Sequence, residues 1–223
     1  MNNDPYNHLR SIHNCVGFYD HTQPWITHCS IQRHEVFMIN QYHDQYHKPV
    51  VFDEMAYEGN VQYGWGNITS EEMLRRFWEC ALRGGYPGHG ETYLGYDNVL
   101  WWSHGGELHG ECHKRVKFLY EIMSQTPCNG LKLGNRDWDC ICGVPQDDDI
   151  AERTGYCIYY FGIMQPLFRD FHLDDDNEYI VEVIDTWEMT ITEIGIFKGK
   201  FRVLLTGKQY MAVRVKKRVQ DNL

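Results

Sequence analysis

The stretch Lys48-Pro49-Val50-Val51-Phe52-Asp53-Glu54 contains a short apolar run that ends abruptly in two carboxylates. A strand buried on both faces of a parallel sheet has this character, because helices cover both faces. Three further strand-like runs span residues 9–14, 25–31 and 86–93. The last of them is rich in glycine, which predicts a close approach of backbones at that point.

Helical patterns separate and follow these runs, at residues 34–46, 70–82 and 116–123. The middle helix is predicted to start at Thr69, whose hydroxyl can cap a free amide while Glu72 reaches back. Gly84-Gly85 is expected to end it. Its apolar positions recur with a helical period and give one face that can pack on a sheet; they are Leu74, Phe77, Trp78, Ala81 and Leu82.

Four strand-then-helix periods in the first 126 residues match the roughly 30 residues per unit of a (β/α)8 barrel. We therefore predict a partial barrel at 1–126 and a glycine- and proline-containing linker at 127–154. Residues 155–223 show only strand-like runs with turn signals between them, which is typical of a small antiparallel β-sandwich. The predicted fold class is thus α/β plus all-β, with about four βα units.

Composition limits the possible functions of the chain. Its 223 residues carry a formal charge of −10, which disfavours a nucleic-acid partner. Apolar stretches are too short for a membrane helix. Because the first residues lack the pattern of a signal peptide, we expect a cytoplasmic protein.

No cofactor and no metal site are expected from sequence motifs. The chain has no GxGxxG after a strand, no phosphate-binding GxxxxGK and no CxxC pair. The run His109-Gly110-Glu111-Cys112-His113 places two histidines four residues apart. It nevertheless fails both zinc-protease patterns, because no glutamate occupies the position that either pattern needs.

A resemblance to a known family gives Glu54 a role. Residues 48–66 resemble the seventh-strand motif of retaining glycoside hydrolases built on (β/α)8 barrels. Residues 4–14 are similar to the fifth-strand segment of the apiosidase-like branch of these enzymes, and residues 88–93 to its eighth strand. That branch commonly carries a β-sandwich after the barrel. The resemblance implies that the chain corresponds to strands five to eight and the trailing sandwich.

In such enzymes the seventh-strand glutamate is the nucleophile, a position that Glu54 matches. Retention needs a second carboxyl group about 5 to 5.5 Å away, and the resemblance assigns it to strand four, which this chain does not contain. Asp53 adjoins Glu54 and is expected to point to the opposite face of the strand. Glu91 is a candidate proton donor, a ligand for substrate hydroxyls or a modulator of the Glu54 pKa.

Further polar and aromatic residues are expected at strand ends or in the following loops, where they can contact a sugar. Each has a structural interpretation as well, since buried histidines and tryptophans commonly serve packing. The predicted substrate-binding residues are His13, Gln32, Tyr57, Trp65, His89, Glu91 and Trp101.

The leading hypothesis is the C-terminal portion of a retaining glycoside hydrolase acting on O-glycosidic bonds of plant-type or other complex carbohydrates. A half barrel leaves strand edges unpaired, so we expect poor activity until a second polypeptide or self-association completes the ring. The alternatives are a noncatalytic carbohydrate-binding protein and a docking subunit.

Overall fold

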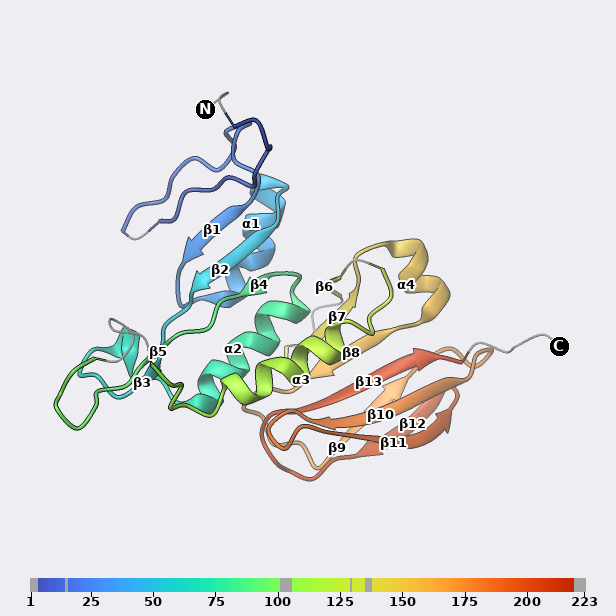
Figure 1. Ribbon diagram of the computed structural model, residues 1–223. Helices are drawn as coiled ribbons and strands as arrows, with labels where there is room; N and C mark the ends of the chain where they lie inside the picture. The colour runs from blue at the N-terminus through green and yellow to red at the C-terminus, as the bar shows by residue number, and fades with distance from the viewer. Residues whose placement is uncertain (1–3, 15, 101–105, 129, 135–137, 219–223) are drawn as a thin grey trace. The chain divides into compact units, whose positions relative to one another are not determined.

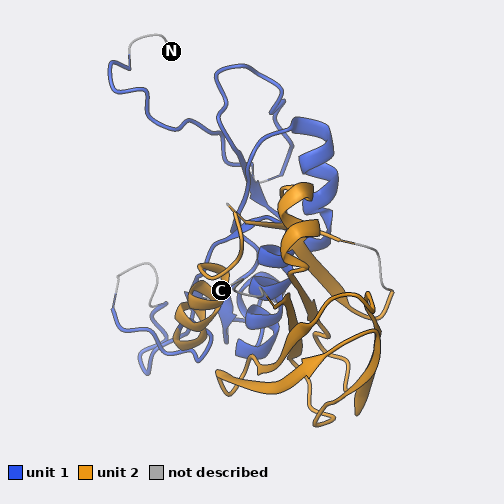
Figure 2. Ribbon diagram, turned by 90° about the vertical axis from the view of Figure 1, so that its right-hand side faces the viewer, with its two compact units in different colours: residues 1–113 blue, residues 114–223 orange. Residues whose placement is uncertain are grey.

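The computed structural model describes residues 4–14, 16–100, 106–128, 130–134 and 138–218. The chain divides into two compact units, residues 1–113 and 114–223, which Figure 2 colours separately. Each unit is described by itself.

Unit 1 is built on a parallel sheet of three short strands in the order β1-β2-β4 (Figure 1). The strands are β1 (Cys29–Gln32), β2 (Val50–Glu54) and β4 (Tyr86–Pro87). Val50 and Phe52 of β2 are fully buried. The apolar run therefore forms the central parallel strand, as its sequence predicts.

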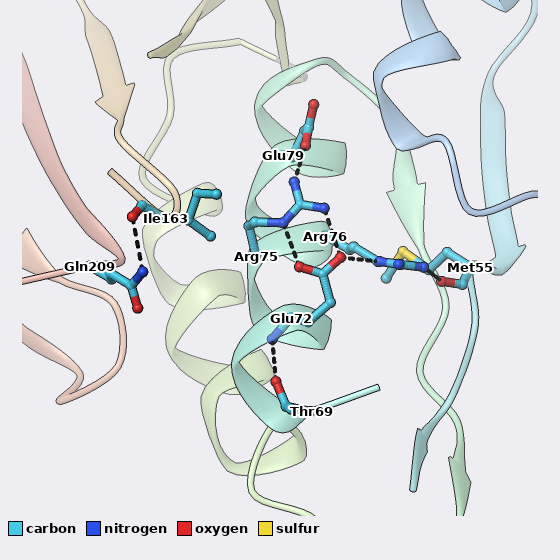
Figure 3. A network of polar contacts seen from close by, with 8 residues as sticks. All are labelled: Met55, Thr69, Glu72, Arg75, Arg76, Glu79, Ile163 and Gln209. Carbon is cyan, nitrogen blue, oxygen red and sulfur yellow. Dashed lines mark hydrogen bonds and ion pairs between the residues drawn. The ribbon is translucent and has the colours of Figure 1, made fainter. Parts of the chain in front are cut away.

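The helices of unit 1 begin where local sequence favours them. They are η1 (Val36–Met38), α1 (Ile39–Tyr46) and α2 (Ser70–Leu82), and α2 lies beside β4. Thr69 caps α2 by accepting a 3.2 Å hydrogen bond from the Glu72 amide. The predicted return bond from Glu72 is absent, because its carboxylate binds Arg75 and Arg76 instead (Figure 3).

A second, two-stranded parallel pair continues the unit beyond the main sheet. It joins β3 (Glu58–Gly59) to β5 (Glu91–Thr92), and η2 (Gly64–Gly66) lies between β3 and α2 in the chain. A Cβ atom on Gly88 would lie 2.6 Å from the Asp53 carbonyl oxygen, and one on Gly90 would overlap the Tyr57 ring. These close contacts confirm why glycine is needed in the segment that joins β4 to β5.

The predicted strand at residues 9–14 does not form as a strand. Only His13 makes a bridge, to Ser30 of β1. Side-chain hydroxyls replace ladder partners here: the Arg10 amide donates to the Thr27 hydroxyl at 2.7 Å, and the Ser11 hydroxyl donates to a backbone carbonyl. These local bonds compete with regular pairing.

Unit 2 contains a six-stranded antiparallel sheet in the order β11-β10-β13-β8-β7-β6. Its strands are β6 (Leu131–Leu133), β7 (Ile141–Pro145), β8 (Cys157–Tyr160), β10 (Tyr179–Asp185), β11 (Thr190–Phe197) and β13 (Met211–Lys217). A second sheet pairs β9 (Phe168–His172) with β12 (Lys200–Leu204). Phe171 and Val203 of this pair share a core with Val181 and Val213 of the larger sheet. Parallel βα units followed by an antiparallel β-sheet unit confirm the predicted fold class.

The segment 127–154 contains more structure than the linker predicted for it. It holds β6, β7 and the helix α4 (Asp148–Thr154), and β7 pairs directly with β8. The strands are short and contain or adjoin glycines, which weaken the sequence signal. Before them, α3 (His113–Met123) confirms the last predicted helix. Among the described residues, no helix combines the length and apolarity that crossing a membrane requires.

Candidate active site

Glu54 lies at the carboxyl end of β2, and both of its carboxylate oxygens have polar neighbours. His13 Nε2 is 3.0 Å from Oε1, and Gln32 Nε2 donates to Oε2 at 2.9 Å. Gln32 ends the neighbouring strand β1. The Glu54 side chain keeps 30% of its surface exposed. Two residues from neighbouring segments thus hold the carboxylate in a fixed orientation while leaving it accessible.

Asp53 reaches the same imidazole ring. His13 Nδ1 lies 3.0 Å from Asp53 Oδ2, and the Ser30 hydroxyl donates to that same oxygen. Asp53 was expected to point to the opposite face of the strand from Glu54, but both carboxylates contact the same His13 ring. The pairing of β1 with β2 shifts register between Ser30 and Gln32, and such an irregularity redirects side chains locally.

The His13 ring is held between two carboxylates, and this controls its charge. Partial burial lowers its pKa, but the hydrogen bond to Asp53 and the charges of Asp53 and Glu54 outweigh burial and raise the pKa above 6.5. Protonation lets both ring nitrogens donate, one to each carboxylate.

Tyr57 and Trp65 lie in the segment that joins β2 to α2. Burial and a hydrogen bond with Glu54 raise the pKa of Tyr57, so its hydroxyl remains a donor to that carboxylate. The Tyr57 and Trp65 rings meet edge to face with centroids 6.0 Å apart. Trp65 also stacks on Tyr63, and its side chain is 40% exposed. Trp65 therefore presents an exposed aromatic face next to Tyr57, and such a face is suited to the apolar face of a sugar ring.

Helix α2 fixes the backbone directly after Glu54. The Arg76 guanidinium donates to the Met55 carbonyl, and Glu72 holds that guanidinium from the other side at 2.7 Å (Figure 3). Met55 is fully buried. Figure 3 also draws a hydrogen bond within unit 2 that does not involve Glu54: the Gln209 side-chain amide donates to the Ile163 carbonyl at 3.0 Å. The contacts around Arg76 position the Glu54 end of β2 without touching its carboxylate.

A second, fully buried carboxylate belongs to Glu58 in β3. Its Oε1 accepts from the Ser70 hydroxyl, from the Tyr93 hydroxyl at 3.1 Å and from the Glu111 amide at 2.8 Å. The Cys112 amide donates to Oε2 at 3.2 Å. Burial opposes ionisation, but these donors and the nearby His89 outweigh it and lower the pKa of Glu58 to about 2.

His89 and Glu91 lie in this second cluster with Glu58. His89 Nε2 is 3.9 Å from Glu58 Oε2 and 3.8 Å from Glu91 Oε1. The His109 and Gly110 amides donate to Glu91 Oε2 at 2.7 and 3.0 Å. The structure thus groups His13, Gln32 and Tyr57 around Glu54, with Trp65 packed against Tyr57. It groups His89 and Glu91 near Glu58. The predicted substrate contact Trp101 lies outside the described residues.

Ser30 and His113 are polar partners that no sequence pattern indicated, and Glu58 had no predicted role. Ser30 is a single polar residue within β1 and belongs to no sequence motif. His113 Nδ1 lies 3.4 Å from Glu91 Oε1. The Glu58 carboxylate binds amides 53 and 54 residues further along the chain, a separation that no local pattern reveals.

Comparison with known structures gives the family relation. A protein from Bacteroides vulgatus described as a "putative glycoside hydrolase" is 30% identical over 97% of this chain, with a TM-score of 0.84. The chain is thus similar in sequence and fold to a protein described as a putative glycoside hydrolase. It covers 46% of that protein, so it spans about half of its length. This partial coverage is consistent with a fragment of a glycoside hydrolase.

Two further solved structures agree on the fold. One described as a glycoside hydrolase has a TM-score of 0.65 and 12% identity, over 92% of this chain and 56% of its own. A glycoside hydrolase family 5 protein from Bacteroides vulgatus has a TM-score of 0.54 and 14% identity, over 79% of this chain and 43% of its own. The family model for a domain of unknown function, DUF5605, matches residues 138–216. No curated protein matches the sequence.

Proposed function

We propose that this chain is the C-terminal portion of a retaining, apiosidase-like glycoside hydrolase and that Glu54 is its nucleophile. The observation that carries the proposal is the placement of Glu54: it ends a buried parallel strand and has its two oxygens held by His13 and Gln32. Barrel enzymes keep reactive groups at this end of their strands, because the loops converge there.

The donors around Glu54 suit nucleophilic attack on an anomeric carbon. A nucleophilic carboxylate must present one oxygen to the sugar in a defined direction, since small displacements lose much of the rate. His13, Gln32 and Tyr57 supply that orientation. His13 is a positioning residue in this scheme, because it acts on the sugar through Glu54.

The proton donor must come from elsewhere. Of the carboxylates around Glu54, Asp53 is engaged by His13 and Ser30. Glu91, the donor considered from sequence, is buried and accepts two backbone amides. We therefore propose that a segment outside this chain supplies the general acid and the remaining barrel strands. The substrate is a carbohydrate with an O-glycosidic bond.

The test is to supply the missing half of the barrel, either as a separate polypeptide or by expressing the chain fused to it. The assembled protein should hydrolyse an aryl glycoside with retention of anomeric configuration, and Glu54→Gln should lower kcat at least 1000-fold. Glu35→Gln, a change at an exposed position in the same unit, is the matched control. Full turnover by the Glu54→Gln protein would refute the assignment, and saccharide binding without turnover would favour the noncatalytic alternative.

A further inference from the structure

Ligating atoms from three separate segments of the sequence converge in unit 1. Glu58 of β3, His89 between β4 and β5, and Cys112 before α3 each place one ligand atom so that all three lie within 4.8 Å of one another. Glu58 and Cys112 are fully buried. A carboxylate oxygen, an imidazole nitrogen and a thiol sulfur in this proximity form the donor set of a zinc site.

Three neighbouring atoms are buried without a hydrogen bond in the described structure: His89 Nε2, Glu91 Oε1 and His113 Nδ1. They lie 3.8 Å (His89 to Glu91) and 3.4 Å (His113 to Glu91) apart. These separations are longer than ordinary hydrogen bonds. Buried polar groups without partners need an explanation, and an ion between them is one.

The Glu58 carboxylate is already oriented for such a role. Its Oε1 accepts three hydrogen bonds, from Ser70, Tyr93 and the Glu111 amide. Oε2 accepts only the Cys112 amide at 3.2 Å and faces His89 Nε2 at 3.9 Å. One oxygen therefore anchors the side chain while the other is left to coordinate, which is the usual division between the ligand atom and its supporting hydrogen bonds.

We propose that Glu58, His89 and Cys112 bind a structural Zn²⁺ ion, with Glu91 as the fourth ligand. Tetrahedral zinc with bonds of about 2.0 to 2.3 Å keeps its ligand atoms about 3.3 to 3.8 Å apart. His89 Nε2 already lies within 3.9 Å of Glu58 Oε2 and 3.8 Å of Glu91 Oε1. On binding, the Cys112 thiol loses its proton to solvent and the sulfur binds as thiolate.

The proposal departs from the expectation of no metal. Metal-binding motifs are defined by spacing along the chain, and the run from His109 to His113 does not have the zinc-protease spacing. Of the three candidate ligands only Cys112 belongs to that run. Glu58 comes from β3 and His89 from the β4–β5 connection, and folding brings these segments together. A zinc ion there would cross-link these three segments independently of catalysis at Glu54.

The experiment loads the full chain with one equivalent of Zn²⁺, removes free metal by gel filtration and measures bound zinc by mass spectrometry. We expect close to one zinc per chain. His89→Gln and Cys112→Ser should each retain less than about a tenth of that. Cys128→Ser, which removes an exposed thiol, should retain all of it. Zinc lost on gel filtration, or retained equally by all variants, would overturn the proposal.

A measurement on the unaltered protein guards against misfolded variants. X-ray absorption of the zinc-loaded chain should show one sulfur and otherwise nitrogen or oxygen neighbours. A zinc shell without sulfur would place the ion elsewhere and reject the site.

Discussion

Replacing Glu58 by glutamine tests whether a buried, ionised carboxylate holds unit 1 together. Four donors point at this group: the hydroxyls of Ser70 and Tyr93 and the amides of Glu111 and Cys112. Glutamine replaces one carboxylate oxygen with an NH2 group, which donates hydrogen bonds and cannot accept them. Some of the four donors then lose their acceptor, and a buried unsatisfied group costs about 1 to 3 kcal/mol. We therefore expect a large loss of stability from a nearly isosteric change.

The pH dependence gives the magnitude and its sign. A pKa lowered from 4.5 to about 2 corresponds to about 3 kcal/mol of stability at neutral pH. Because the folded-state pKa is depressed, this stability is present above the unfolded pKa and is lost as the pH falls from about 5 toward 2. The difference between the wild type and Glu58→Gln should shrink to about 1.5 kcal/mol at pH 3.

The assay is urea unfolding at pH 7 and pH 3, followed by circular dichroism in the presence of EDTA so that metal plays no part. Glu35→Gln, at an exposed position, should change the unfolding free energy by less than about 0.5 kcal/mol. A loss for Glu58→Gln below about 0.5 kcal/mol at pH 7, or an equal loss at both pH values, would show that the ionised carboxylate does not stabilise unit 1.

Two other predictions concern the surroundings of the two carboxylates. Gly110→Ala would place a Cβ atom against the Glu58 carboxylate, whereas the space around Gly64 is open. In thermal melts, Gly110→Ala should therefore destabilise the protein by about 2 kcal/mol or more. The control Gly64→Ala should destabilise it far less. NMR titration should give His13 a pKa above 6.5 that falls in Asp53→Asn, because Asp53 bonds its ring. Stability from this raised pKa is present below pH 6.5 and is lost as the pH rises through the folded value; a His13 pKa unchanged by the substitution would contradict the assignment.

The sequence was most informative where local rules suffice. Residues 50–54 form β2 as predicted, and Thr69 caps α2 where its hydroxyl precedes an apolar periodicity. Both signals depend only on residues that are close in the sequence, so long-range packing does not alter them.

Side-chain direction and long-range partners could not be predicted in the same way. Asp53 contacts His13 because pairing shifts register beside it, and alternation along an isolated strand cannot reveal that shift. Two of the four donors to Glu58, the Glu111 and Cys112 amides, lie more than fifty residues away in the sequence. The glycine-containing strands β6 and β7 form because they pair with each other and with β8, and their own composition gives a weak strand signal.

The most direct test of the central claim is to identify the residue that carries the sugar during turnover. The barrel, completed by its missing half, would be incubated with an aryl 2-fluoroglycoside, whose covalent glycosyl-enzyme intermediate is slow to hydrolyse, and digested for mass spectrometry. The proposed retaining mechanism predicts one sugar attached to Glu54. A label on any other residue, or hydrolysis with inversion and no label, would contradict it.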